Sequence, residues 1–449
     1  MHESHIGRNL EQGIATLRRE DPELFDLLEQ EHLRQGETLS LVASSGGTDA
    51  SVMAVVGSSI VNVTAEGYPG RRYHAGCHYV DRAEELAIAR AKKVFGARYV
   101  NVQPHCASFA NHTVMQAVLK PGDTILGMAL DQGGHLTHGS PVNLSGRLFD
   151  VHAYGLDEKG LIDYGELRAL ALEHRPRLIV CGTTSYTRVI DFERIRAVAD
   201  EVGAYVLADV THIAGLIAAG LHPSPIDAAH FTTTCTFKQL YGPRGGLIMM
   251  GRDADRLGDD DSRTLSQRIR SAVFPMMQGS PEVHTIAAKA RAMDRLLQPG
   301  FGELAQRIRD NADALAASLA RRGYDVIGGG TDNHIVLFRV PPHLNGVVAE
   351  RALESCHILV NKNKIPGDTR GATVASGVRL GSNTVALRHM GPEQMERCVE
   401  LIDTVLTHVR TLPEGDAQVP DDVRAQVVAA IRDLCRDFPL PYATATETL

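Results

Sequence analysis

Apolar residues follow two alternating patterns along the first half of the chain. Apolar positions spaced three or four residues apart predict helices near residues 21–35, 81–95, 108–119, 163–174 and 192–202. Short apolar runs predict strands between them, at 101–103, 124–128, 178–181 and 204–209. Since continuous apolar runs are typical of strands buried on both faces, this alternation predicts an α/β fold with a mostly parallel central sheet flanked by helices.

A second, smaller α/β unit is expected after about residue 290. Helical patterns at 301–322, 347–356 and 392–412 alternate there with apolar stretches such as 334–338. We therefore predict an N-terminal arm over residues 1–40, a large domain over 41–295 and a small C-terminal domain over 296–449. The apolar stripe of the arm fits packing on a partner subunit, and it fits an ordinary intrachain helix equally well.

Two predicted helices begin with possible capping residues. Asp81 and Glu84 have the spacing of a capping box, so the helix is expected to start at Asp81, to carry Leu86 on its apolar side and to stop at Gly96. Ser108 has two possible roles. It either caps its helix or, together with the free backbone N–H groups there, forms an anion site.

Composition narrows the class of protein. The 449 residues are 43% hydrophobic and 22% charged, with a net charge of −8, so nucleic acid and anionic membranes are not expected partners. The seven cysteines contain no CxxC pair, which argues against a disulfide framework and a zinc ribbon. With neither a signal peptide nor a membrane-length apolar run, a soluble cytoplasmic protein is predicted.

Lys238 and Asp209 are the first candidates for chemistry. Lys238 follows a hydroxyl-rich stretch and precedes the glycine turn 242–246. A lysine in a dry pocket becomes a nucleophile, although most lysines are surface charges. Asp209 ends a predicted strand, where its carboxylate suits the protonated ring nitrogen of pyridoxal 5′-phosphate (PLP); helix capping is the alternative.

Two further segments carry acid–base or ring-stacking candidates. His135 follows two glycines and suits stacking on a flat ring. The spacing from His135 to His138 would suit a metal, but the sequence offers no obvious third ligand, so no metal is predicted. Glu66 lies between glycine turns and is a plausible proton-transfer group, the alternative being a solvated loop.

Together these segments resemble serine hydroxymethyltransferase over about residues 40–400. The resemblance is carried by nine stretches of sequence: 65–70 (AEGYPG), 101–105 (NVQPH), 133–143 (GGHLTHGSPVN), 160–164 (GLIDY), 221–225 (LHPSP), 242–246 (GPRGG), 272–275 (AVFP), 361–363 (NKN) and 365–368 (IPGD). It implies a fold-type I PLP-dependent transferase that uses tetrahydrofolate as co-substrate. It also implies a homodimer or homotetramer with active sites shared between subunits.

The resemblance assigns roles residue by residue. Lys238 resembles the Schiff-base lysine, His135 the ring-stacking residue, Asp209 the pyridinium partner and Glu66 the proton-transfer group. The implied cofactor contacts are Cys106, Ala107, Ser108, His135, Thr184, Asp209, His212, Cys235, Lys238 and Gly279. The implied substrate contacts are Ser44, Thr64, Glu66, Tyr73, His74 and Arg379, with Arg379 as the carboxylate clamp. The implied folate contacts are Leu130, Gly134, Leu136 and Asn363, with Tyr73 close by.

Departures from the family pattern bear on the substrate. Thr64 and His74 replace two tyrosines, and Thr64 removes ring volume beside the substrate's α-carbon, which leaves room for a methyl group. This pair resembles the α-methylserine (D-alanine) hydroxymethyltransferase branch. Neutral drift in an ordinary serine enzyme and a folate-independent aldolase or transaldolase remain alternatives, as does an inactive PLP-fold scaffold. Gly371-Ala372-Thr373 replaces a family Ser-Pro-Phe, which puts folate affinity in question, and Cys235 replaces a threonine near PLP.

Overall fold

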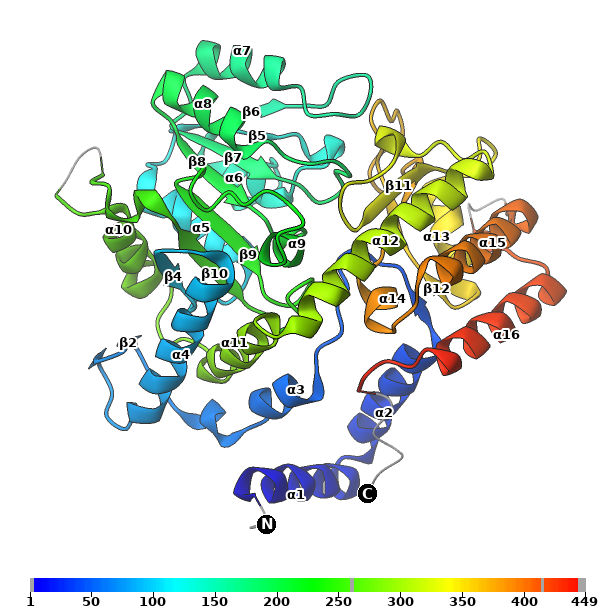
Figure 1. Ribbon diagram of the computed structural model, residues 1–449, viewed down its shortest axis with the longest axis horizontal. Helices are drawn as coiled ribbons and strands as arrows, with labels where there is room; N and C mark the ends of the chain where they lie inside the picture. The colour runs from blue at the N-terminus through cyan, green and yellow to red at the C-terminus, as the bar shows by residue number, and fades with distance from the viewer. Residues whose placement is uncertain (1–3, 259–261, 413–415, 443–449) are drawn as a thin grey trace.

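A computed structural model describes residues 4–258, 262–412 and 416–442 of the chain. Figure 1 shows a large α/β unit beside a smaller one, with two N-terminal helices projecting from the body. The last seven residues of the predicted small domain lie outside these ranges, as do the first three residues of the chain, which belong to the segment considered for a signal peptide.

The large unit is built on a seven-stranded sheet. Its spatial order is β4 (Tyr99–Asn101), β10 (Gly246–Met250), β9 (Phe231–Cys235), β8 (Tyr205–Asp209), β7 (Leu178–Gly182), β5 (Thr124–Met128) and β6 (Asp150–Tyr154). The neighbours from β9 to β6 pair in parallel, and β10 pairs antiparallel with both β9 and β4. The predicted mostly parallel sheet is confirmed.

Alternate residues of the strands enter different hydrophobic cores on the two faces of this sheet. Ile179 and Val206 belong to the core that includes side chains of helices α4 (His78–Phe95), α7 (Tyr164–His174) and α8 (Phe192–Val202). Leu178 and Leu207 belong to the core that includes side chains of α5 (Ala107–Val118) and α10 (Leu265–Ser271). Because both faces are covered, every residue of β7 and β8 is buried.

The small unit has its own antiparallel sheet and hydrophobic core. The strand order is β11 (Ile335–Arg339), β14 (Gly377–Gly381) and β13 (Asn361–Asn363). Its core includes side chains of helices α12 (Pro299–Arg321), α13 (Gly346–Ser355), α15 (Pro392–His408) and α16 (Asp421–Asp437). Strand β1 (Leu39–Ser40) pairs in parallel with β12 (Ile358–Leu359) and brings Leu39 into this core. The chain therefore crosses the small unit before it enters the large one.

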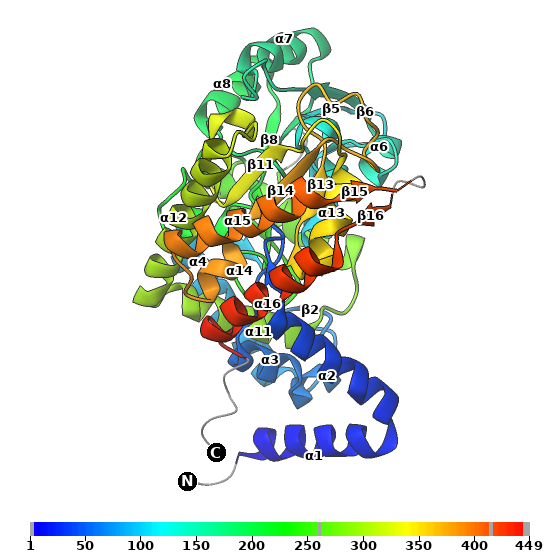
Figure 2. The same ribbon diagram turned by 90° about the vertical axis from the view of Figure 1, so that its right-hand side faces the viewer.

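The N-terminal arm consists of helices α1 (His5–Glu20) and α2 (Pro22–Glu37), neither of which buries a residue. Figure 2 shows both helices reaching below the body, with α2 beside α16. The predicted apolar stripe is largely exposed at Leu24, Leu27, Leu28 and Leu33. Packing within this chain therefore leaves the stripe uncovered.

The predicted start of one helix, the capping role of Ser108 and the apolar-side position of Leu86 are wrong. Helix α4 begins at His78, and both Asp81 and Glu84 lie inside it, where they pair with Arg72 at 2.7 and 2.6 Å. These carboxylates therefore anchor a loop instead of capping the helix, and Leu86 is exposed. Helix α5 is capped by the Cys106 side chain, not by Ser108. The predicted end at Gly96 and the 192–202 helix are confirmed.

The other predicted elements match within a few residues. Within the described part of the chain, no helix combines the length and the apolar character needed to cross a membrane.

Candidate active site

A cavity of about 230 Å³ lies at the carboxyl ends of β7, β8 and β9. This is the edge where open parallel sheets bind ligands. Nine of the ten predicted cofactor contacts line it: Cys106, Ala107, Ser108, His135, Thr184, Asp209, His212, Cys235 and Lys238. The tenth, Gly279, is not part of this lining.

Lys238 follows β9 and reaches into the cavity. Its Nζ lies 2.8 Å from Nε2 of His212, a buried ring whose Nδ1 has no hydrogen-bond partner. Burial lowers the pKa of Lys238 and, together with the nearby lysine charge, lowers that of His212 well below the usual histidine value. A lysine whose neutral form is favoured is a nucleophile for carbonyl groups.

Asp209 ends β8 with its carboxylate on the cavity wall. Burial opposes its ionisation, but hydrogen bonds from His138 and Thr211 and the nearby histidine charges outweigh this and hold the pKa of Asp209 well below its usual range. Oδ2 accepts from Asn111 Nδ2 at 2.8 Å, and Oδ1 accepts from the Thr211 N–H at 3.0 Å. The site therefore keeps a fixed negative charge at one wall.

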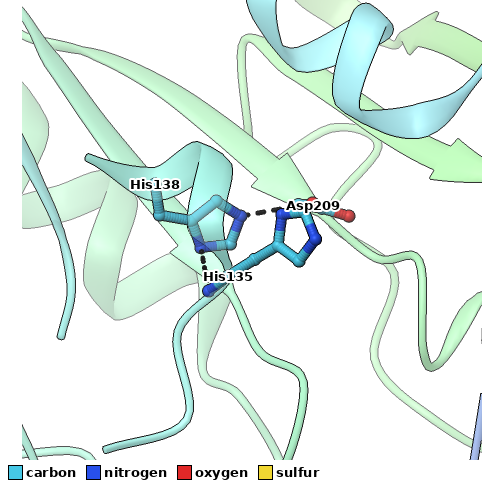
Figure 3. Close-up of side chains that lie close together, drawn as sticks. All are labelled: His135, His138 and Asp209. Atoms are coloured by element: carbon cyan, nitrogen blue, oxygen red, sulfur yellow. Dashed lines mark hydrogen bonds and ion pairs between the residues drawn. The ribbon is translucent and has the colours of Figure 1, made fainter. Parts of the chain in front are cut away.

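His135, His138 and Asp209 form a compact group, with potential metal-ligand atoms within 4.8 Å of one another (Figure 3). The sequence offered no third ligand beside the two histidines, and the structure supplies one in Asp209. However, both ring nitrogens of His138 are engaged, Nδ1 with the His135 N–H at 3.3 Å and Nε2 with Asp209 at 3.2 Å. In this arrangement His138 supports Asp209 by hydrogen bonding.

His135 lies beside Asp209 on the cavity lining. Its Nδ1 is 2.7 Å from the Thr137 hydroxyl, which fixes the ring. Burial lowers the pKa of His135 to about 4, so the ring is neutral near physiological pH. A neutral, fixed imidazole suits stacking against a flat ligand.

Another part of the wall is formed by the N-terminus of α5, where Cys106, Ala107 and Ser108 line the cavity. Free N–H groups and the helix dipole favour an anion there. Arg244 also lines the cavity, with its guanidinium 4.3 Å from the centre of the Phe237 ring. Arg244 lies in the 242–246 motif (GPRGG), but no local signal in the sequence marks it as a site residue.

Arg379 lies on β14 of the small unit and reaches toward the cavity. Its Nη1 donates to the Thr184 carbonyl oxygen and its Nε to Asn361 Oδ1 at 2.9 Å. Burial lowers the pKa of Arg379 to about 10, which leaves it cationic at neutral pH. Both partners named here are neutral oxygens, so the positive charge remains available to an anionic ligand.

Ser44 belongs to a segment held between the two units. The carbonyl of Ala43 accepts from His334 Nε2 and from Asn383 Nδ2, both at 3.1 Å. A Cβ on Gly46 would collide with the carbonyl oxygens of Phe237 and Lys238. The chain on either side of Ser44 is therefore fixed close to the lysine. His334 and Asn383 were missed as supports of this segment because they are remote from Ser44 in sequence.

The remaining predicted catalytic and substrate residues form a separate group. Thr64, Glu66, Tyr73 and His74 lie on one loop, and none of them lines the Lys238 cavity. A Cβ on Gly279 would lie 3.1 Å from Glu66 Oε1, so Gly279 belongs to this group. Thr64, Tyr73 and His74 are exposed. Within one chain, the predicted site is therefore divided into two clusters.

The predicted folate contacts lie on two facing segments. Leu130 and Leu136 flank His135 in sequence and are 46% and 43% exposed. Asn363 ends β13, and the next residue, Lys364, pairs with Asp131 at 3.4 Å. This ion pair brings the two segments together. Gly134 packs closely on the Met128 carbonyl, where a side chain would collide.

Comparison with known protein families shows a match over most of the chain. The sequence model of the family described as serine hydroxymethyltransferase matches residues 17–402, which is most of the chain.

Proposed function

Since the chain belongs to the serine hydroxymethyltransferase family of PLP- and tetrahydrofolate-dependent enzymes, we propose that it moves a one-carbon unit between α-methylserine or D-alanine and tetrahydrofolate. The observation that carries this proposal is Thr64, two residues before Glu66, where the family usually has a tyrosine beside the substrate's α-carbon. A threonine leaves space for the extra methyl group of α-methylserine. His74, on the same loop, changes a second tyrosine position.

The residues of the cavity fit PLP. Buried His212 has an orphaned Nδ1 and contacts the amine of Lys238 through Nε2, and the N-terminus of α5 and the Asp209 carboxylate also line the cavity. These features suit, respectively, the phenolic oxygen, the aldehyde, the phosphate and the ring nitrogen of the cofactor. When bound, PLP supplies an electron sink for the electron pair released at the amino acid's α-carbon.

Each of the residues of the site would have a separate role. Lys238, whose pKa is lowered by burial, would hold the cofactor through its amine. Arg379 would bind the substrate carboxylate and so fix the orientation of the amino acid in the site. Asp209, whose carboxylate stays ionised, would favour a proton on the ring nitrogen of the cofactor. Glu66 moves protons near the hydroxymethyl and folate groups.

Two clusters within one chain support a shared active site. We place Thr64, Glu66, Tyr73, His74 and Gly279 of one subunit against the Lys238 cavity of a second copy. A homodimer or homotetramer would cover surfaces that one chain leaves exposed. These surfaces are Thr64, Tyr73, His74 and the apolar stripe on α2.

The activity assay separates this proposal from its alternatives. Formaldehyde or methylene-tetrahydrofolate production from α-methylserine is measured with and without tetrahydrofolate. Strong dependence on tetrahydrofolate supports transfer, whereas equal cleavage without it would indicate a folate-independent aldolase. Turnover of serine far above that of α-methylserine would indicate an ordinary serine enzyme.

A further inference from the structure

Lys289 is a buried lysine with no role in the chemistry described above. It lies on α11 (Val283–Leu296), is 1% exposed, and donates three hydrogen bonds from Nζ. The acceptors are the carbonyl oxygens of Val102 at 2.6 Å, Pro104 at 3.1 Å and Gly246 at 3.0 Å. Each N–H of an ammonium group therefore meets a backbone oxygen.

This arrangement places a positive charge where burial is costly. Transfer of an ammonium into a protein interior is unfavourable unless hydrogen bonds or an opposite charge compensate. Here the hydrogen bonds go to neutral carbonyl groups, so the three N–H groups are satisfied but the net charge is not neutralised. An anion bound nearby would favour the protonated form of Lys289 further.

The acceptors belong to the backbone that forms the anion wall of the cavity. Val102 and Pro104 precede Cys106, which caps α5. Gly246 packs directly on this segment, since a Cβ there would collide with the Cys106 carbonyl and the Ala107 nitrogen. Lys289 thus joins the two backbone segments that meet behind the α5 N-terminus.

We propose that Lys289 is a positioning residue for the phosphate group of PLP, which holds the 102–108 segment against Gly246 and adds a buried positive charge behind the α5 N-terminus. The proposal rests on PLP as the cofactor and on the α5 N-terminus as its phosphate site. It does not depend on which amino acid the enzyme uses, because its test requires no substrate.

The charge of Lys289 also gives a pH signature. Burial lowers the pKa of Lys289 to about 7, with Glu282, Glu84 and Cys106 as the acidic groups that oppose this shift. A bound phosphate dianion favours the protonated lysine, so phosphate binding weakens as Lys289 loses its proton at higher pH. A cofactor without phosphate lacks this dependence.

The experiment compares PLP with pyridoxal, which lacks the phosphate. Dissociation constants of both for the apoprotein are measured from the visible absorbance of the bound cofactor. Lys289→Gln keeps hydrogen-bonding capacity without charge, and Lys92→Gln at an exposed site is the matched control. We expect Lys289→Gln to weaken PLP about tenfold or more and pyridoxal less than about twofold, with the control unchanged.

An equal change for both ligands, or no change for either, would overturn the proposal. Should Lys289→Gln fail to fold, the wild-type apoprotein gives a second test. Between about pH 7 and 9, where the phosphate is already a dianion, its preference for PLP over pyridoxal should fall as pH rises. A preference that stays constant across this range would contradict the proposal.

Discussion

The amine of Lys238 and the imidazole Nε2 of His212 lie 2.8 Å apart in a buried pocket. Two basic groups in such contact cannot both carry a proton without strong repulsion, and burial lowers the pKa of each. The pair therefore favours a neutral amine, which is the form that attacks an aldehyde.

This pair predicts the pH dependence of cofactor uptake. The rate at which the apoprotein attaches PLP should rise with pH and level off below 10.5, the ordinary lysine value, because the neutral amine is already abundant there. Stopped-flow absorbance measures this rate, and Lys238→Gln should show no covalent attachment. A rate that keeps rising up to the ordinary lysine value would contradict the prediction.

Removal of the Asp209 charge should impair chemistry more than cofactor binding. Asp209→Asn cannot hold a proton on the cofactor ring nitrogen, so kcat is expected to fall about 100-fold or more. The affinity for PLP, measured by absorbance, should stay within about tenfold of the wild-type value, since the other walls of the cavity are intact. Asp433→Asn on the exposed face of α16 is the control, and normal turnover by Asp209→Asn would exclude the assigned role.

The division of the site into two clusters predicts complementation between inactive variants. Lys238→Gln and Glu66→Gln remove one residue from each cluster, and each should be inactive alone. If sites are shared between subunits, an equal mixture that exchanges subunits forms one intact site in each mixed dimer, about a quarter of wild-type activity in all. Activity after co-refolding measures this. Differently tagged chains show whether mixed dimers form. If mixed dimers form but activity does not recover, each site is built within one chain.

The elements that position the cofactor pocket were predictable from local sequence. The apolar run 204–209 predicted the strand, and its last residue, Asp209, lies on the cavity wall as expected. The hydroxyl-rich and glycine-rich surroundings of Lys238 marked it only as a candidate, and the resemblance to serine hydroxymethyltransferase gave it a role. The strand signal is local to the residues concerned, whereas the role of Lys238 needed the pattern of several distant motifs.

Features made by distant residues were not predictable in this way. Asp209 is the third member of the group with His135 and His138, yet it lies 71 residues from His138. The Asp81 and Glu84 pattern suggested a helix cap, and only the fold reveals that both pair with Arg72. Likewise, nothing local to Lys289 indicates that three carbonyl groups from two other segments converge on it.

Thr64→Tyr tests the residue that we hold responsible for substrate choice. The ring should fill the space assigned to the α-methyl group, so kcat/KM for α-methylserine should fall about tenfold or more while that for serine rises. Thr48→Ser, at a half-buried position outside both clusters, is the control for effects of substitution on folding and purification. An unchanged ratio of the two kcat/KM values would remove Thr64 as the cause.

The most direct test of the proposed function is the ratio of kcat/KM for α-methylserine to that for serine in the wild-type enzyme, with tetrahydrofolate and PLP saturating. The proposal predicts a ratio well above one, of about tenfold or more, and exchange of the α-proton of D-alanine in the reverse direction. A ratio well below one would contradict it and identify the protein as a serine-specific member of its family.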